Sequence, residues 1–343
     1  MQHLAIDLGS RESQICIRDQ HGEILAERKV ATARLPAYLQ KQPLSRVVLE
    51  TSSEAFFVAG AALEAGHQVR VVAATLVRSL GVGERGIKTD QRDARKLSEV
   101  STRIDLPSVH VPSELSRERK ALCNSRSTLL GCRTKLINYV RGRLRTRAVV
   151  LSRRKPDTFP QHVRELLLSL PDGVPAHLQR VLTVIDTLNQ QLKDADKELL
   201  ALAEQDPLCK RLMTVPGVGP VIAMRFVAVV DQPERFHSAH HLMSYLGLTP
   251  GERSSSMRSH RTGITKAGCS DLRHALVQGA WSMMRCKKQE PMAQWALLVA
   301  NRRNKQVAVV ALARKLIGVL WAMWSTGSDY QRDKAAAPAA TTT

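Results

Sequence analysis

The stretch His3-Leu4-Ala5-Ile6-Asp7-Leu8 is an apolar run interrupted by one carboxylate, and it predicts the first strand of a sheet. Similar short runs, bounded by Gly, Ser or Pro, occupy residues 13–18, 23–30, 46–50 and 68–73. The first three runs follow one another closely enough to form an antiparallel meander. A helix over residues 54–65 and a polar helix over 90–103 complete the predicted α/β domain of residues 1–105.

Four carboxylates stand at the ends of these predicted elements. Asp7 ends the first strand, Glu50 ends the fourth, and Asp90 and Asp93 share one face at the start of the polar helix. Clustered carboxylates repel unless a cation neutralises them, and all-oxygen ligands suit Mg²⁺ or Mn²⁺. Two such ions would stabilise the attacking and leaving oxygens of a phosphodiester. Alternatively, Asp90 caps the helix, Asp93 complements its dipole and Glu50 lies in a surface loop.

The charge of the chain is strongly positive and unevenly spread. The 343 residues carry a formal net charge of +20, with +2 over residues 1–100, +10 over 101–160 and +10 over 201–343. This surplus indicates a polyanionic partner, with nucleic acid ahead of a membrane surface. The aromatic content of only 4% argues against recognition by base stacking over exposed rings.

Other features exclude several classes of protein. No apolar run reaches the roughly 18 residues of a membrane span, and the N-terminus lacks the pattern of a secretory signal. The cysteines form no C-x-x-C pair that could hold zinc or run redox chemistry. We therefore expect idle thiols in a reducing cytoplasm and no membrane partner.

The connector, residues 106–205, is predicted to be helical and basic. Over residues 112–148 a helix is expected. Basic residues that could hold nucleic acid lie at its end and just beyond it: Arg141, Arg143, Arg145, Arg147, Arg153, Arg154 and Lys155. Further on, apolar residues repeat in a heptad: Leu178, Val181, Ile185, Leu188, Leu192, Ala195, Leu199 and Leu202. This is the seam of a coiled coil, formed either with residues 112–148 of the same chain or with a second copy.

The third part, residues 206–330, is expected to be mainly helical, and the Ala- and Thr-rich residues 331–343 are expected to be a disordered tail. The turn Pro216-Gly217-Val218-Gly219 precedes an apolar helix, so Gly217 and Gly219 could let backbone N–H groups approach a phosphate. A tight turn between packed helices explains the same glycines equally well.

A loop rich in serine and basic residues spans residues 247–268. Its Arg253, Arg258, Arg261 and Lys266 suit a phosphate backbone. One of its serines could instead be a nucleophile. No carboxylate is at hand to orient the nearby His260, so activation would have to come from a metal or from Arg258, Arg261 and Lys266.

Taken together, these motifs resemble the transposases of the insertion-sequence 110 and 1111 type, the DEDD transposases. The residues that carry the resemblance are Ile6-Asp7, Glu50-Thr51, Lys88 to Arg95, Pro216 to Gly219, Gly247 to Pro250 and Ile264 to Gly268. Two departures are Glu50-Thr51-Ser52-Ser53, where the family usually has E-x-T-G, and Ser254-Ser255-Ser256, where the nucleophile is commonly followed by Gly.

The resemblance implies an N-terminal domain of the RuvC-like (ribonuclease H) type whose Asp7, Glu50, Asp90 and Asp93 bind Mg²⁺. It also implies a C-terminal transposase domain in which Ser255, with Ser254 as the fallback, forms a covalent phosphoserine link to DNA. A coiled-coil connector, a homodimer or tetramer, donor and target DNA, and an element-encoded bridge RNA as guide belong to the same expectation, in a prokaryotic cytoplasm at the nucleoid. The alternatives are a metal-dependent nuclease of the junction-resolvase kind, in which water attacks, and a binding remnant without activity.

Overall fold

The computed structural model describes residues 1–79, 90–152, 154–169, 173–252 and 261–332, and all structural statements concern these ranges. The chain divides into two compact units, residues 1–113 and 114–343. The finer division of residues 114–343 into connector, transposase domain and tail remains a prediction.

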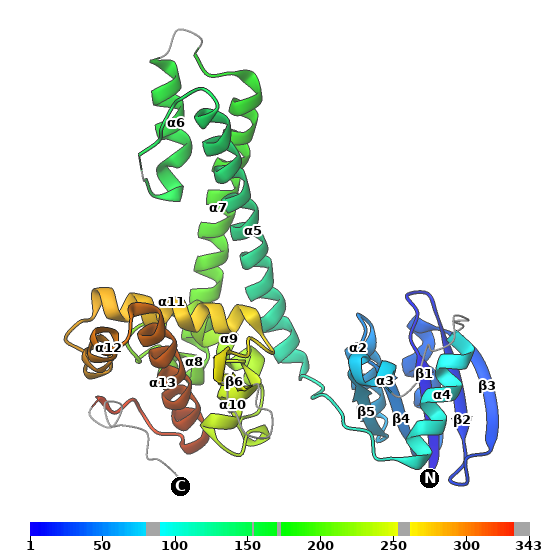
Figure 1. The fold of residues 1–343 in the computed structure, drawn as a ribbon. Helices are drawn as coiled ribbons and strands as arrows, with labels where there is room; N and C mark the ends of the chain where they lie inside the picture. The colour runs from blue at the N-terminus through cyan, green and yellow to red at the C-terminus, as the bar shows by residue number, and fades with distance from the viewer. Residues whose placement is uncertain (80–89, 153, 170–172, 253–260, 333–343) are drawn as a thin grey trace. The chain divides into compact units, whose positions relative to one another are not determined.

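The first unit is built on a five-stranded sheet in the order β3-β2-β1-β4-β5 (Figure 1). The strands are β1 (Gln2–Asp7), β2 (Glu12–Arg18), β3 (Ile24–Ala31), β4 (Ser45–Glu50) and β5 (Gln68–Val72). Strands β1, β2 and β3 pair antiparallel, whereas β1, β4 and β5 pair parallel. The predicted meander and the crossover to a parallel strand are both confirmed.

Helices cover the two faces of this sheet. Their bounds are α1 (Leu35–Leu39), α2 (Ala55–Glu64), α3 (Ala74–Ser79) and α4 (Asp90–Arg103), with a 3-10 turn at Thr32–Arg34. On one face, Leu4 and Ile6 are fully buried in a cluster with Val58 of α2. On the other face, Ala5 packs in a cluster with Leu97 of α4. The alternation along β1 therefore serves two apolar layers, and the mixed α/β class is confirmed.

The second unit starts with a long helical hairpin (Figure 1). Helix α5 (Glu114–Arg145) packs against α7 (Ala176–Gln205), and between them lie a 3-10 turn (Pro156–Thr158) and α6 (Phe159–Leu168). Side-chain pairs between the two helices show that they run antiparallel, because the residue numbers of the partners fall along α7 as they rise along α5. The pairs are Arg119 with Asp206, Arg126 with Asp196, and Arg133 with Asn189.

The heptad seam on α7 is buried only in part. Leu178, Ile185, Leu192 and Leu199 are buried as expected, but the alternate positions Val181, Leu188, Ala195 and Leu202 are half-buried. The remaining buried residues of α7 are Leu182, Asn189 and Ala203. The second buried position of the heptad lies one residue beyond the predicted one at Leu182, Asn189 and Ala203, so the repeat of seven is kept and the face turned toward α5 is shifted. The partner that the structure supplies is α5 of the same chain, and a dimer contact remains a prediction.

The rest of the second unit is a helical core with one small β ribbon. Its elements are α8 (Pro207–Leu212), α9 (Pro220–Val230), a 3-10 turn (Pro233–Arg235), α10 (Ala239–Tyr245), β6 (Pro250–Glu252), β7 (Arg261–Ile264), α11 (Ser270–Cys286), α12 (Pro291–Arg302) and α13 (Lys305–Thr326). Strands β6 and β7 pair antiparallel. The expectation of a mainly helical region after the connector is confirmed.

Helix α13 is, within the described ranges, long and apolar enough to cross a membrane, with a mean hydropathy of 1.7 over its most apolar window. The sequence predicted no apolar run of this length. Arg314 and Lys315 interrupt the apolar residues, which is why a scan for consecutive apolar positions passes over it. Leu312, Leu316 and Leu320 of α13 are fully buried in the core cluster of the second unit, as in the central helix of a globular domain.

Candidate active site

Asp7 and Glu50 lie at the ends of two neighbouring parallel strands. Strand β1 ends at Asp7 and β4 ends at Glu50, and the preceding residues Ile6 and Leu49 are register partners. Because side chains alternate along a strand, Asp7 shares a face with Ala5, and Glu50 shares the same face with Val48. Both carboxylates therefore belong to the face that α4 covers, at the carboxyl edge of the parallel strands.

The direction of α4 brings its first turn toward that edge. Ser101, near the end of the helix, lies 2.8 Å from Nδ1 of His3 at the start of β1, measured from its hydroxyl oxygen. From Ser101 back to Asp93 a helix rises about 12 Å, and from His3 to Asp7 a strand extends about 13 Å. Asp93 is 8% exposed, so its side chain faces the sheet. The helix thus carries Asp93 to the level of Asp7.

Further contacts fix α4 on the sheet. Ser98 donates a hydrogen bond from Oγ to Sγ of Cys16 at 3.2 Å and accepts one from Nε of Arg18 at 2.9 Å. Arg95 pairs with Glu27 of β3 at 2.5 Å, and this pairing holds the pKa of the Glu27 carboxyl below its ordinary value. These contacts set the height and rotation at which the first turn of α4 meets the sheet.

Asp90 takes a different place from Asp93. It is exposed, and its charge adds to the environment that raises the pKa of Lys29, after the hydrogen bond and charge of Glu12, which stands 2.6 Å from Lys29. Lys29 pairs with Gln14 in the sheet, and Gln14 pairs with Asp7. The charge of Asp90 therefore acts on Lys29 of β3. Among the residues that the structure describes, no three His, Cys, Asp or Glu side chains converge as ligands of one ion.

The predicted nucleophile Ser255, together with Ser254, Arg253 and Arg258, lies outside the described residues. The legs of its loop are described. Gly247 (φ +66°) and Gly268 (φ +68°) adopt left-handed conformations where the legs meet: a Cβ on Gly247 would contact Ala267, and one on Gly268 would contact the carbonyl oxygen of Tyr245. The two family motifs at residues 247–250 and 264–268 thus form the closed base of the serine loop.

Hydrogen bonds tie the two legs together. The N–H of Lys266 donates to the carbonyl of Gly247 at 3.0 Å, with Lys266 itself at φ 57° and exposed. Arg273 of α11 donates from Nη1 to the carbonyls of Leu246 (2.8 Å) and Ala267 (2.7 Å), one on each leg. Arg261 begins β7. The sequence analysis did not single out Arg273, because an isolated arginine in a helix has no local signal.

A second arginine that the sequence analysis missed joins three helices. Arg225 of α9 is 5% exposed, and its guanidinium pairs with Asp271 of α11 at 3.0 Å and donates to the carbonyl of Cys123 in α5 at 2.7 Å. A buried guanidinium must be paired in this way to be tolerated. Arg225 therefore links the hairpin to the helix that follows the serine loop.

The glycine turn before α9 packs closely on α11. A Cβ on Gly217 (φ +82°) would lie 2.8 Å from the carbonyl oxygen of Gly279, whereas a Cβ on Gly219 would meet nothing within 4 Å. Gly217 thus has a packing role in the described structure. The open surroundings of Gly219 leave its predicted phosphate contact as a prediction.

The basic residues at the far end of the hairpin are largely exposed. The guanidinium of Arg141 lies over the ring of Phe159, 5.4 Å from its centroid. The exposed residues are Arg143, Arg145, Arg147, Arg154 and Lys155, while Arg153 lies outside the described residues. Their positions suit the predicted role of holding a phosphate backbone, which remains a prediction.

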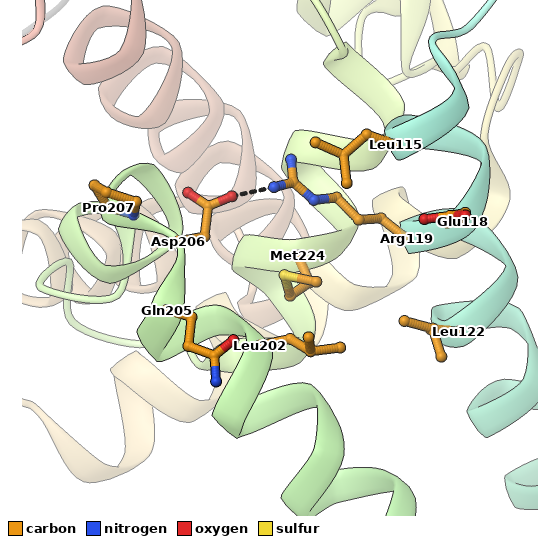
Figure 2. Close-up of a pocket in the computed structure, with 9 residues that line it drawn as sticks. All are labelled: Leu115, Glu118, Arg119, Leu122, Leu202, Gln205, Asp206, Pro207 and Met224. Carbon is orange, nitrogen blue, oxygen red and sulfur yellow. Dashed lines mark hydrogen bonds and ion pairs between the residues drawn. The ribbon is translucent and has the colours of Figure 1, made fainter.

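A pocket of about 420 Å³ opens where the hairpin meets α8 and α9 (Figure 2). Arg119 forms an ion pair across it with Asp206. Asp206 also accepts hydrogen bonds from the backbone N–H groups of Leu208 and Cys209, capping α8. The other lining residues are Leu115, Glu118, Leu122, Leu202, Gln205, Pro207 and Met224. The predicted site residues within the described ranges lie elsewhere.

Two family models match the chain. A DEDD transposase model named for IS110 matches residues 4–147, which include Asp7, Glu50, Asp90 and Asp93. The model described as "Transposase IS116/IS110/IS902 family" matches residues 209–296, which include the serine loop. The chain belongs to the IS110 family of transposases. An IS110-family transposase cuts and joins DNA, and the DEDD model suggests a divalent metal ion.

Relatives of this transposase extend over nearly its whole length. The "Probable family 20 transposase" of Pseudomonas aeruginosa is 26% identical over 96% of this chain and 99% of the relative. The "Transposase for insertion sequence element IS1111A" of Coxiella burnetii is 27% identical over 96% of this chain and 91% of the relative. The "Transposase for insertion sequence element IS1328" of Yersinia enterocolitica is 26% identical over 96% of this chain and 98% of the relative. These matches confirm the resemblance inferred from the motifs.

Proposed function

We propose that this transposase cuts and rejoins DNA through a covalent phosphoserine on Ser255, with Mg²⁺ held by Asp7, Glu50, Asp90 and Asp93, and with an element-encoded RNA as guide. The observation that carries the proposal is the placement of Asp7, Glu50 and Asp93 on one face of the sheet, at the edge where the parallel strands end. The basic serine loop, closed at its base, supports the second half of the proposal.

The donor set fits a hard divalent cation. Carboxylate oxygens are the ligands that Mg²⁺ prefers, and Mn²⁺ accepts the same set. Asp7 and Glu50 would supply ligands from the sheet, and Asp93 would supply one from α4. Asp90 would complete the set of ligands from the exposed start of α4. When bound, the metal would stabilise negative charge on the attacking and leaving oxygens of the phosphodiester.

The serine step conserves the energy of the phosphodiester. The Oγ of Ser255 attacks phosphorus, the Oγ–P bond forms, the bond to the 3′ oxygen breaks, and the serine proton ends on that 3′ oxygen. In the second step a 3′ hydroxyl attacks the phosphoserine and Ser255 regains its proton. No ATP is needed, because each step exchanges one phosphodiester for another. Arg253, Arg258, Arg261 and Lys266 would stabilise the charge of the phosphorane.

The positive charge would supply the electrostatic contacts that hold nucleic acid. The net charge of +10 over residues 101–160 and +10 over 201–343 suits contacts with phosphate, which fix position without reading sequence. Base pairing by a guide RNA would then provide the specificity. In the proposed assembly, a dimer or tetramer forms through α7.

Trapping the intermediate tests the proposal. The full-length transposase is incubated with DNA carrying its element ends and Mg²⁺, quenched in denaturant and examined for protein attached to DNA. We expect an adduct in the wild type and in Ser254→Ala, and none in Ser255→Ala. An adduct that persists in Ser255→Ala would overturn the serine assignment. Cleaved DNA without an adduct would support the nuclease alternative, because the carboxylates alone suffice for hydrolysis by water.

RNA guidance has a separate test. RNA that copurifies with the transposase is sequenced. A single RNA encoded beside the element's ends is expected, whereas bulk cellular RNA alone would contradict the guide.

A further inference from the structure

Five cationic and aromatic side chains form a continuous row over residues 235–245. The guanidinium of Arg235 lies 5.0 Å from the ring centroid of Phe236 and 5.6 Å from that of Tyr245. Phe236 meets Tyr245 edge-on at 5.3 Å and His241 edge-on at 5.6 Å. His237 stacks parallel on His241, with centroids 5.8 Å apart and an interplanar angle of 8°. We call these five residues the ring row.

The ring row is exposed at its outer members and anchored at its centre. Tyr245 is 43% exposed, and His237 and His241 are exposed, whereas Phe236 is only 4% exposed. Arg235 is held from behind, because its Nη1 donates to the carbonyl of Val230 at 2.8 Å. Such a row is organised before any partner binds, so a partner that stacks on it orders few additional side chains.

Anchors outside the row fix the segment that carries it. The side chain of Ser238 accepts the N–H of His241 at 3.2 Å and caps α10. Trp321 of α13 donates from Nε1 to the carbonyl of Pro233 at 3.4 Å. The segment is therefore braced internally by Ser238 and attached to the helical core through Trp321.

The row adjoins the base of the serine loop. Tyr245 ends α10, Gly247 follows two residues later as one leg of that base, and Gly268 of the other leg packs against the backbone of Tyr245. Strand β6 (Pro250–Glu252) follows α10 after four residues. The exposed rings therefore lie beside the base from which the serine loop extends.

The chemistry of the row favours a nucleobase over an apolar partner. The chain has an aromatic content of only 4%, yet Phe236 and Tyr245 lie here against one guanidinium, and two histidines extend the row from Phe236. A flat ring with a nearby cation is the arrangement on which single-stranded bases stack, and stacking requires an unpaired base because paired bases are covered on both faces. The low aromatic content argues against stacking surfaces spread over the chain, but it is compatible with a single local one.

We propose that Tyr245, His237 and His241, backed by Arg235 and Phe236, form a stacking platform for an unpaired base of the DNA strand. Its position next to the reacting phosphate rests on the proposed role of Ser255, whereas the stacking itself does not. The platform gives the transposase a preference for a locally unwound DNA substrate.

A stacking-sensitive fluorophore tests the platform. The full-length transposase is titrated into single-stranded DNA that carries 2-aminopurine, whose emission falls when the base stacks on an aromatic ring. We expect quenching with the single strand and none when the fluorophore lies inside a duplex. Tyr245→Ser should weaken binding of the single strand about tenfold without changing its salt dependence, because no phosphate contact is lost. Tyr245→Phe should bind as the wild type does.

Matched variants separate the platform from a folding defect and from the proposed chemistry. Tyr139→Ser removes another exposed tyrosine, 47% exposed on α5, and should keep the quenching. His237→Ala, at an exposed edge of the row, should reduce it. Ser255→Ala should quench fully even where it abolishes the covalent adduct.

Several results would overturn the platform. These are no quenching in the wild type, equal quenching in Tyr245→Ser, or quenching by a 2-aminopurine RNA strand alone. Loss of the adduct with quenching intact would overturn the role of Ser255 and leave the platform standing.

Discussion

Arg95 of α4 holds Glu27 of β3 with two hydrogen bonds, from Nε to Oε1 and from Nη2 to Oε2, each 2.5 Å long. Gln91, one turn earlier, donates to the same carboxylate at 3.1 Å. Asp90 and Asp93 flank Gln91 in the sequence, so this carboxylate positions the part of α4 that carries the candidate metal ligands. The edge strand β3, far from the parallel strands in the sheet order, thereby influences the acidic edge.

Acid should loosen this attachment. The hydrogen bond from Arg95 is the largest cause that lowers the pKa of Glu27 below its ordinary value of 4.5. A carboxyl whose pKa is lower when folded contributes stability above 4.5 and loses that contribution as the pH falls through its folded value. Glu27→Gln should therefore show a smaller loss of thermal stability between pH 6 and pH 3 than the wild type.

The expected size of that effect is small. The Arg95 side chain is 46% exposed, so solvent screens the pair and limits its contribution to about 1 kcal/mol or less. Thermal unfolding followed by circular dichroism over the same pH range is the measurement. Glu12→Gln, which also breaks an exposed ion pair to β3 but removes no hydrogen bond to α4, serves as the control. Identical acid profiles for Glu27→Gln and the wild type would contradict the prediction.

Removing the strand-end carboxylate should abolish cleavage. Asp7→Asn keeps the size of the side chain and removes the charge that the proposed metal requires, so we expect loss of strand cleavage with DNA binding retained. Asp105→Asn is the matched control in the same unit, because Asp105 is 71% exposed and pairs with Arg46 and Arg70 instead. Cleavage assays and DNA-binding titrations in Mg²⁺ measure both properties. Full cleavage by Asp7→Asn would remove this residue from the site.

The two glycines of the turn before α9 should respond differently to substitution. Gly217→Ala forces a Cβ against the carbonyl of Gly279 at a positive φ, and should destabilise the second unit by about 1–3 kcal/mol. Gly219→Ala meets open space and should leave the free energy of unfolding nearly unchanged. Urea denaturation compares the two. Weaker DNA binding by Gly219→Ala at unchanged stability would support the predicted phosphate contact, and equal destabilisation by both would contradict the packing argument.

The cysteines should differ in reactivity toward alkylating reagents according to their burial. Burial, with the nearby charge of Asp206 adding to it, raises the pKa of Cys209 to about 12, and burial also raises the pKa of Cys123. Cys132 and Cys286 are exposed. Iodoacetamide at pH 8 should therefore modify Cys132 and Cys286 in the folded protein and spare Cys123 and Cys209, as read by mass spectrometry of peptides. Rapid labelling of Cys209 before unfolding would show that the α8–α9 core opens.

The sheet was predictable from the sequence because its signals are local. Each strand is a short apolar run bounded by turn residues, and the polar helix begins at Asp90 as expected. The short helices α1, α3 and α6 were missed, since five to ten residues between prolines and polar positions have little periodicity. The predicted seam on α7 was correct at one of its two heptad positions, because sequence periodicity determines the repeat and not the direction from which α5 approaches.

The candidate site was predictable only where residue type and strand position coincide. Asp7 and Glu50 are acids at the ends of apolar runs, which a reader of the sequence can find. Arg225 and Arg273 act through carbonyl groups of other segments, and nothing in their own sequence neighbourhood shows this. The ring row was likewise hidden, because its members are common residues whose rings meet only after α10 folds.

The hairpin of α5 and α7 fixes a distance as well as a fold. The 30 residues of α7 span about 45 Å, more than one turn of a B-form duplex. Arg143, Arg145 and Lys155 lie at the far end of this hairpin, and Lys266 lies in the helical core at the other end of α7, beside α11, so these basic residues are too far apart to contact the same phosphates. The proposed phosphate contacts would therefore hold nucleic acid at two places, separated by more than one turn of a duplex.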